Sequence, residues 1–173
     1  MKRPFVFAAL LTSLTHTATA AEFIQPPDHQ NLDGTVSRAL VQQSDNFINM
    51  KYPYEGNTHL NLVVMKTASP KWIDSVSPGS IKFLADRGQV YCDKVDVCLM
   101  SYRIDNGPVK TLKFTNQAED GSTNTAYVIN PLTLASQLKG KKKLVVEIPL
   151  FKEGSQQFTF DLQNLQPSFA KLK

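Results

Sequence analysis

Alternation of apolar and polar positions is the main pattern in the second half of the chain. It is clearest near the C-terminus, where Phe158, Phe160 and Leu162 alternate with Thr159 and Asp161. Because side chains two residues apart on a strand point to the same face, this segment predicts a strand with one buried and one wet face. Similar short runs, each bounded by turn residues, predict strands over 60–67, 81–85, 89–92 continued by 97–104, 109–115, 125–129, 143–149 and 156–162.

Turn and helix signals separate these runs. The clearest turn is Asp105-Asn106-Gly107-Pro108, because Asn and Gly readily take the positive φ values that a tight hairpin needs. Asn130-Pro131 ends one strand and predicts a short helix that ends at Gly140. Its apolar face would consist of Leu132, Leu134, Ala135 and Leu138. The predicted fold class is therefore mainly β: an antiparallel sheet or sandwich of about seven strands with one or two short helices.

The N-terminal part of the chain lacks the strand pattern. Residues 21 to about 33 are polar and rich in proline, which predicts an extended arm. In this N-terminal part, a helix is predicted only within residues 35–50, where the apolar residues Val36, Leu40, Phe47 and Ile48 lie near helical spacing. We therefore divide the chain into three parts. Residues 1–20 form an N-terminal signal peptide, as argued next; residues 21–50 form an extended arm with room for a short helix; and residues 51–173 form a single β-rich domain.

The first 20 residues have the three parts of a secretory signal peptide. Lys2 and Arg3 precede an apolar stretch that runs from Phe5 to about Leu14, and Ala18-Thr19-Ala20 is a typical cleavage site. The apolar stretch is roughly half of the ~20 residues that a membrane-spanning helix needs. We expect export to the periplasm or secretion, cleavage after Ala20, and no membrane span.

Two cysteines, Cys92 and Cys98, remain after cleavage. In an exported protein, an even number of cysteines close in sequence predicts one disulfide bond. The alternative is a metal site, but five intervening residues match no common zinc pattern, and the mature chain keeps only His29 and His59 as further ligands of that kind. We expect the disulfide and no bound metal.

The charge pattern does not indicate nucleic-acid binding. The formal charge of +4 falls to +2 when Lys2 and Arg3 are removed, and the remaining cations are scattered. The one dense run is Lys139, Lys141, Lys142 and Lys143. Such a run is either a solvated turn or a contact for an acidic partner or lipid headgroups. Trp72, the single tryptophan, is either a core residue or an interface anchor.

Motifs for catalysis are missing from the sequence. It has no Gly-rich phosphate loop, no nucleophile elbow, no paired histidines on a helix and no Cys-His couple. A serine nucleophile would need His29 or His59 as its base, and we interpret His59 as an exposed edge residue. Most carboxylates fall in turns, where they cap backbone groups. We therefore predict no enzyme activity, no catalytic residues and no cofactor.

Part of the mature chain resembles the TagO/VasI envelope accessory proteins of type VI secretion. The resemblance rests on Cys92, on the turn Arg103-Ile104-Asp105-Asn106-Gly107-Pro108, and on the segments 138–146 and 158–162. It covers roughly half of the mature chain, and Cys98 and the N-terminal half depart from the family pattern. The resemblance implies a periplasmic accessory role through protein contacts, with no catalytic residues.

Two functions remain open from the sequence. The first is a non-catalytic periplasmic interaction module, whose partner would be another envelope or secreted protein. The second is an inhibitor of a secreted hydrolase of the lysozyme type, which would insert the disulfide-clipped loop into the enzyme's cleft. Both use the same candidate contact residues, which are Asp93, Lys94, Asp96, Lys141, Lys142 and Lys143. The oligomeric state is not determined by the sequence.

Overall fold

The computed structural model describes residues 24, 27, 29–30, 36–67, 81–93, 97–116, 123–163 and 165. The predicted signal peptide and Trp72 lie outside these residues. The elements are β1 (His29–Gln30), β2 (Val36–Gln43), β3 (Ile48–Met50), β4 (Gly56–Thr58), β5 (Leu60–Thr67), β6 (Ile81–Ala85), β7 (Cys98–Ile104), β8 (Lys110–Thr115), β9 (Thr125–Val128), α1 (Pro131–Leu138), β10 (Lys143–Leu150) and β11 (Gly154–Asp161). The predicted helix after Asn130 is confirmed as α1.

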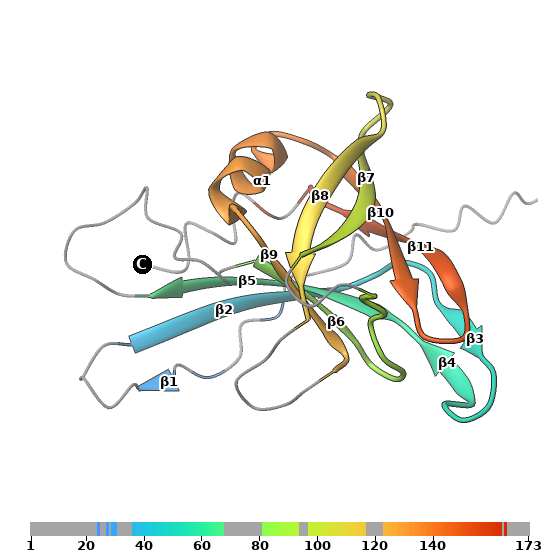
Figure 1. Ribbon diagram of the computed structural model, residues 1–173. Helices are drawn as coiled ribbons and strands as arrows, with labels where there is room; N and C mark the ends of the chain where they lie inside the picture. Colours follow the sequence, from blue (N-terminus) through green and yellow to red (C-terminus); the bar gives the residue numbers. More distant parts are fainter. Residues whose placement is uncertain are drawn as a thin grey trace, which may run out of the picture.

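A single antiparallel sheet dominates the molecule (Figure 1). Its strand order is β1-β2-β5-β6-β9-β8-β7-β10-β11, and β3 and β4 form a separate hairpin. The eight strands from β2 to β11 curl until the two ends of this series nearly meet, so the sheet is almost closed into a barrel. The mainly β, antiparallel prediction is confirmed, and the sheet surrounds its core by curling on itself.

Side-chain hydrogen bonds and one backbone hydrogen bond, rather than a regular ladder, join the end of β2 and the residues after it to β11 along the seam of the curled sheet. Asn46 Oδ1 accepts the Thr159 N–H at 2.8 Å, and Asn46 Nδ2 donates to the Gln157 carbonyl at 2.9 Å. The Asp45 N–H donates to the Thr159 carbonyl at 2.7 Å, and Gln42 Nε2 donates to the Asp161 carbonyl. The outer edge of β11 is therefore covered, which removes a template for unwanted strand pairing.

The core lies inside the curled sheet. Phe83, Phe114, Phe158 and Phe160 are its largest fully buried side chains. The rings of Phe83 on β6 and Phe160 on β11 lie 6.1 Å apart, although these strands are not neighbours in the sheet, so the contact crosses the interior. Buried and half-buried positions alternate along β6, β10 and most of β11, as the sequence pattern predicts. Leu134 and Leu138 of α1 join the same core.

The helix expected within residues 35–50 is wrong. Residues 36–43 form β2, which pairs with β5 from Ser37 opposite Thr67 to Gln43 opposite Asn61, and residues 48–50 form β3. Leu40 and Gln42, two residues apart on β2, both point inward, as a strand requires. Because Gln42 is polar, the sequence does not show the alternation of apolar and polar residues that would have predicted this strand. The described part of the expected arm contributes β1 and pairs with β2.

One smaller expectation also changes. Residues 89–92 do not form a regular strand, because Val90 makes only an isolated bridge to Leu150. Among the residues that the structure describes, no helix is long and apolar enough to cross a membrane.

Candidate interaction surfaces

The two cysteines bracket a loop whose ends are held to the sheet. Cys92 and Cys98 form a disulfide with their Cα atoms 5.6 Å apart, so the predicted pairing is confirmed. Cys98 is buried at the start of β7. Before the loop, the Tyr91 N–H donates to the Pro149 carbonyl and the Val90 N–H to the Thr123 carbonyl, both at 2.9 Å. Both ends of the loop are thus fixed to neighbouring elements.

Of the three contact residues predicted in this loop, the structure places one. Asp93 is exposed next to the disulfide. Lys94 and Asp96 lie outside the described residues. The loop is therefore positioned by its ends, and Asp93 is the predicted contact residue that is visibly available to a partner.

Aromatic side chains gather beside this loop, and the sequence analysis missed them as a group. Tyr91 is 48% exposed, and its ring centroid lies 6.3 Å from that of Phe151. Tyr52 is 76% exposed and, with Pro53 and Tyr54, lines a shallow groove that also includes Glu55, Arg87 and Gly88. We call Tyr52, Pro53, Tyr54, Tyr91 and Phe151 the aromatic end. The run Tyr52-Pro53-Tyr54 is the sequence signal that could have indicated them.

Hydrogen bonds join the parts of the aromatic end. The Lys51 N–H, before Tyr52, donates to Glu153 Oε1 at 2.7 Å. The Phe151 N–H donates to the Gln89 carbonyl at 2.9 Å, which ties the β10–β11 turn to the segment before Tyr91. Lys152 Nζ lies 5.7 Å from the Phe151 ring centroid. Three segments distant in the sequence are thus fixed relative to one another.

The lysine run lies on a turn that Asp105 organises. Asp105 Oδ1 accepts the backbone N–H groups of Lys142 and Lys143, each at 3.0 Å, and the Asp105 N–H donates to the Lys143 carbonyl at 2.9 Å. The N–H groups of Lys142 and Lys143 hold the pKa of the Asp105 carboxyl below its usual range, and nearby lysine charges add to this effect. The side chains of Lys141, Lys142 and Lys143 are exposed, as a solvated turn predicts.

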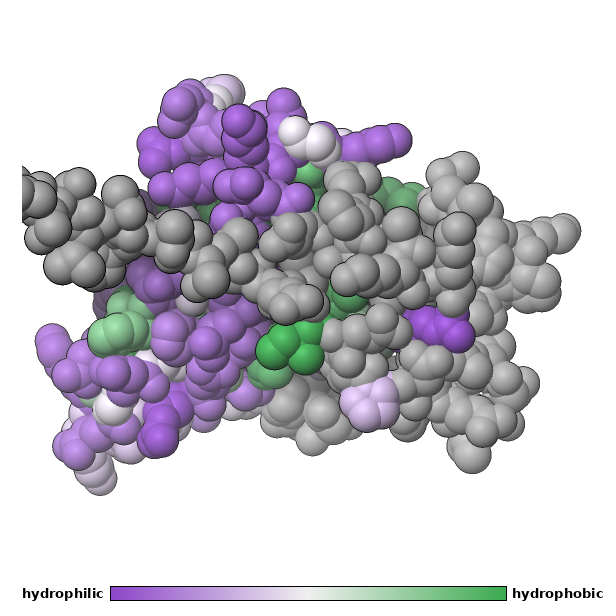
Figure 2. Space-filling model, turned by 180° about the vertical axis from the view of Figure 1, so that it is seen from behind, coloured by the Kyte–Doolittle hydropathy of each residue, from purple (hydrophilic) through white to green (hydrophobic). Residues whose placement is uncertain are grey.

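Further cations surround this turn. Arg103 near the end of β7 and Lys110 at the start of β8 are exposed. We call Arg103, Lys110, Lys139, Lys141, Lys142 and Lys143 the basic end. Seen from behind, hydrophilic side chains cover the upper part of the molecule, where this end lies (Figure 2). A surface of this charge favours acidic partners and steers their approach.

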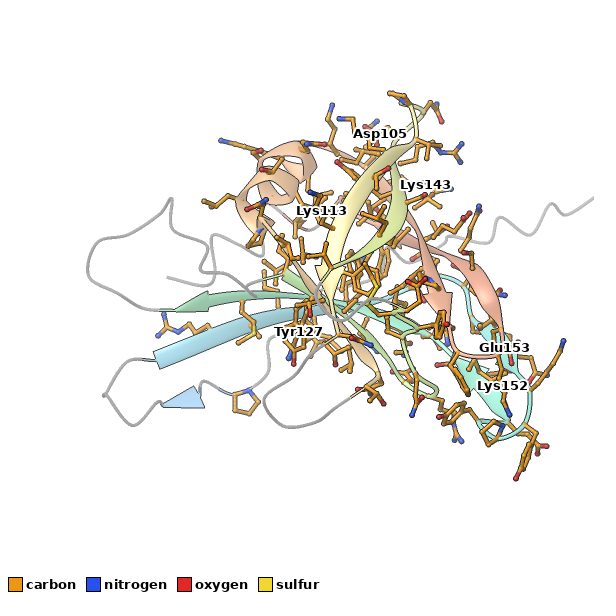
Figure 3. All side chains as sticks on the ribbon, in the orientation of Figure 1. Asp105, Lys113, Tyr127, Lys143, Lys152 and Glu153 are labelled. Atoms are coloured by element: carbon orange, nitrogen blue, oxygen red, sulfur yellow. A yellow bond between two sulfur atoms is a disulfide. The ribbon has the colours of Figure 1, made fainter. Side chains whose placement is uncertain are left out.

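The aromatic end and the basic end lie at opposite ends of the sheet. Strand β7 begins at Cys98 and ends at Ile104, and six residues at about 3.3 Å each separate the two ends by roughly 20 Å. In Figure 3, Asp105 and Lys143 lie at the top, whereas Lys152 and Glu153 lie at the lower right. The predicted contact residues therefore belong to two surfaces, not one.

His59 is not the exposed edge residue that the sequence suggested. It is half-buried, its Nδ1 lies 3.1 Å from the Ser44 carbonyl oxygen, and its ring packs 5.6 Å from that of Phe47. The Ser44 hydroxyl bonds to the Asn46 carbonyl and accepts the Leu60 N–H. Both side chains thus have structural partners. Within the described ranges, no group of three or more His, Cys, Asp or Glu side chains could hold a metal ion.

A scan against protein-family models and searches of the curated proteins and the solved structures found no match for this chain. The resemblance to the TagO/VasI proteins therefore stays a prediction. The function has to be inferred from the chain's own residues.

Proposed function

We propose that this chain is a non-catalytic protein-interaction module that works in the periplasm or outside the cell, and that the aromatic end is its main binding surface. The observation that carries this proposal is the exposure of Tyr91, which adjoins the disulfide at Cys92, together with the exposure of Tyr52, whose neighbour Lys51 is hydrogen-bonded to Glu153 of the β10–β11 turn. The partner would be another envelope or secreted protein.

Exposed tyrosines at a fixed position suit protein recognition. Each has a large apolar ring for burial and a hydroxyl that keeps a hydrogen-bonding partner. Tyrosine is enriched among the residues that contribute most to binding energy. Because the disulfide and the hydrogen bonds to Glu153 and Gln89 already order the backbone here, binding would lose little conformational entropy.

The cellular location and the partner class rest on the sequence. The N-terminal leader supports export, and a disulfide is consistent with an oxidising compartment. The similarity of residues 90–165 to TagO/VasI proteins supports an accessory role in an envelope secretion system.

A second candidate function is inhibition of a secreted hydrolase of the lysozyme type. The disulfide favours it, because fixing both ends of a loop lowers the conformational entropy that the loop would lose on entering an active-site cleft. In that case Asp93 and Tyr91 would contact the enzyme.

Affinity capture with matched variants tests the main proposal. The mature chain, a Tyr52→Ser/Tyr91→Ser variant and a Val109→Ser control are immobilised and exposed to periplasmic extract. Val109 is 67% exposed but lies just before β8, near the basic end, so its substitution removes exposed apolar surface elsewhere. We expect the tyrosine variant alone to lose its partners. Equal capture by all three proteins would show that the aromatic end is not the binding surface.

Enzyme inhibition tests the alternative. Adding a molar excess of the mature chain to a c-type lysozyme should slow its lysis of a cell-wall suspension, and Asp93→Ala should weaken this effect. An unchanged rate of lysis would remove lysozymes of this type as the target and leave the module proposal standing.

A further inference from the structure

We infer that the basic end docks on an anionic lipid bilayer, with the tip of the β7–β8 hairpin entering the layer of headgroups. The tip is the run Asn106-Gly107-Pro108-Val109. This surface lies roughly 20 Å from the aromatic end along β7, so the inference goes beyond the proposed function and does not depend on it.

The tip projects beyond the rest of the sheet. Figure 1 shows that β7 and β8 rise past the neighbouring strands, so the turn that joins them is outermost at this end of the molecule. The Gly107 N–H donates to the Ile104 carbonyl at 3.0 Å, which closes the turn. All four tip residues are exposed, and Val109 is 67% exposed. The fold therefore presents an uncharged tip with two apolar side chains and leaves most of Val109 uncovered.

Cations flank the tip within its own hairpin and on the lysine turn. Arg103 precedes the tip on β7, and Lys110 follows it at the start of β8. Asp105 adjoins the tip and accepts the N–H groups of Lys142 and Lys143, so it holds the lysine turn beside the hairpin.

The end of α1 adds a further cation. Lys110 Nζ and the Tyr102 hydroxyl both donate to Gln137 Oε1 at 2.9 Å, so the last turn of α1 lies against the hairpin. Lys139 follows this turn and is exposed. The basic end is therefore one surface that three segments build around the tip.

Carboxylates balance only part of this charge. The hairpin, α1 and the lysine turn together contain one carboxylate, Asp105, whose Oδ1 already accepts two backbone N–H groups. Two further carboxylates, Asp45 and Asp161, lie near Lys143. Six cations against three carboxylates leave this end positive, and a positive surface attracts anionic headgroups.

The uncharged tip favours a bilayer over an acidic protein as the partner. Lysine and arginine attract either, but a bilayer also receives an apolar side chain beneath its headgroups. Val109 lies where such a side chain belongs, on the outermost turn and among the cations. Among the residues that the structure describes, the large exposed aromatic side chains that typically anchor protein interfaces are Phe47, Tyr52 and Tyr91, and none belongs to the basic end. A chain docked in this way points its aromatic end away from the bilayer.

Vesicle flotation of the mature chain tests the inference. The vesicles contain either phosphatidylcholine alone or an equal mixture of phosphatidylcholine and the anionic phosphatidylglycerol. We expect the chain to float with the mixed vesicles only. Binding should fall steeply as NaCl is raised toward about 1 M, where the screening length is only about 3 Å.

A lysine variant tests the contribution of charge. Lys139, Lys141 and Lys142 are changed together to Gln, and Lys143 is kept because it pairs with Asp161 across β10 and β11. Each lysine near an anionic surface contributes about fivefold to binding, so we expect the affinity for the mixed vesicles to fall about 100-fold.

Two control variants keep the basic end intact. One changes three exposed lysines elsewhere to Gln, namely Lys51, Lys113 and Lys152. The other is Tyr52→Ser/Tyr91→Ser. Both should bind the mixed vesicles nearly as the parent does, so that loss of membrane binding and loss of protein partners can be told apart.

A tryptophan at the tip reports its insertion. In Val109→Trp, the emission should shift to shorter wavelength when mixed vesicles are added, and brominated lipid should quench it, because the indole ring enters an apolar layer. Leu99→Trp is the matched control, since Leu99 is 53% exposed but lies near the start of β7, at the other end of the strand. The parent, with Trp72 as its single tryptophan, gives the baseline.

Three outcomes would overturn the inference. They are no binding to the mixed vesicles, an equal loss of binding in the two lysine variants, and an unshifted emission of Val109→Trp on bound vesicles. In the first case, binding to soluble polyglutamate would assign the basic end to an acidic protein instead.

Discussion

Truncation of Phe160 to alanine tests whether the closing strand holds the core together. Phe160 is fully buried on β11, opposite Leu144 of β10, and its ring meets that of Phe83 across the interior. The substitution removes buried aromatic area and leaves a void, which costs about 3–5 kcal/mol. This is a large share of the 5–15 kcal/mol or so that stabilises a typical domain.

Urea denaturation of the oxidised mature chain measures this cost. With an m-value of about 2 kcal/mol/M, a loss of about 4 kcal/mol lowers the midpoint by about 2 M. Thr159→Ala is the matched control, because the half-buried Thr159 side chain points to the other face of the same strand while its backbone hydrogen bonds remain. If Phe160→Ala unfolded at the parental midpoint, Phe160 would not be part of the core, and the inward alternation of β11 would be incorrect.

Four further predictions concern the seam, the lysine turn and export. Asn46→Ala should lose both side-chain bonds to β11 and speed amide exchange at Thr159; unchanged exchange would show that Asn46 does not close the seam. Because the pKa of Asp105 is lowered from 3.8, its charge stabilises the fold above that pH, and the contribution is lost as the pH falls through the folded pKa. Asp105→Asn should therefore lower Tm at pH 7, and the difference should shrink as the pH falls below 3.8 through the folded pKa; a difference that is constant with pH would contradict this. Changing lysines 141–143 together to Gln should leave Tm nearly unchanged and weaken binding only if the partner is acidic; a large fall in Tm would mean that these side chains are structural. Mass spectrometry of protein from the periplasm should find a chain that begins near Ala21, with no free thiol after unfolding without reductant; a retained Met1 or two reactive thiols would contradict export or the disulfide.

The sequence by itself determined the features that depend on neighbouring residues. Alternation along 156–162 identifies the inward face of β11, Pro131 and Gly140 delimit α1, and the even cysteine count identifies the disulfide. In each case the deciding physical factor is local: the two-residue period of a strand, the fixed φ of proline, or the chemistry of two nearby thiols.

The tertiary structure alone decided the features that depend on distant partners. Residues 36–43 are a strand because β5 supplies their hydrogen bonds. Gln42, whose side chain points inward from this strand, is tolerated in the core because its side-chain amide donates to the Asp161 carbonyl of β11. The aromatic end is likewise assembled from segments about 40 and 60 residues apart, near residues 52, 91 and 151. No local pattern encodes such proximity, because curling of the sheet, rather than spacing along the chain, brings these side chains together.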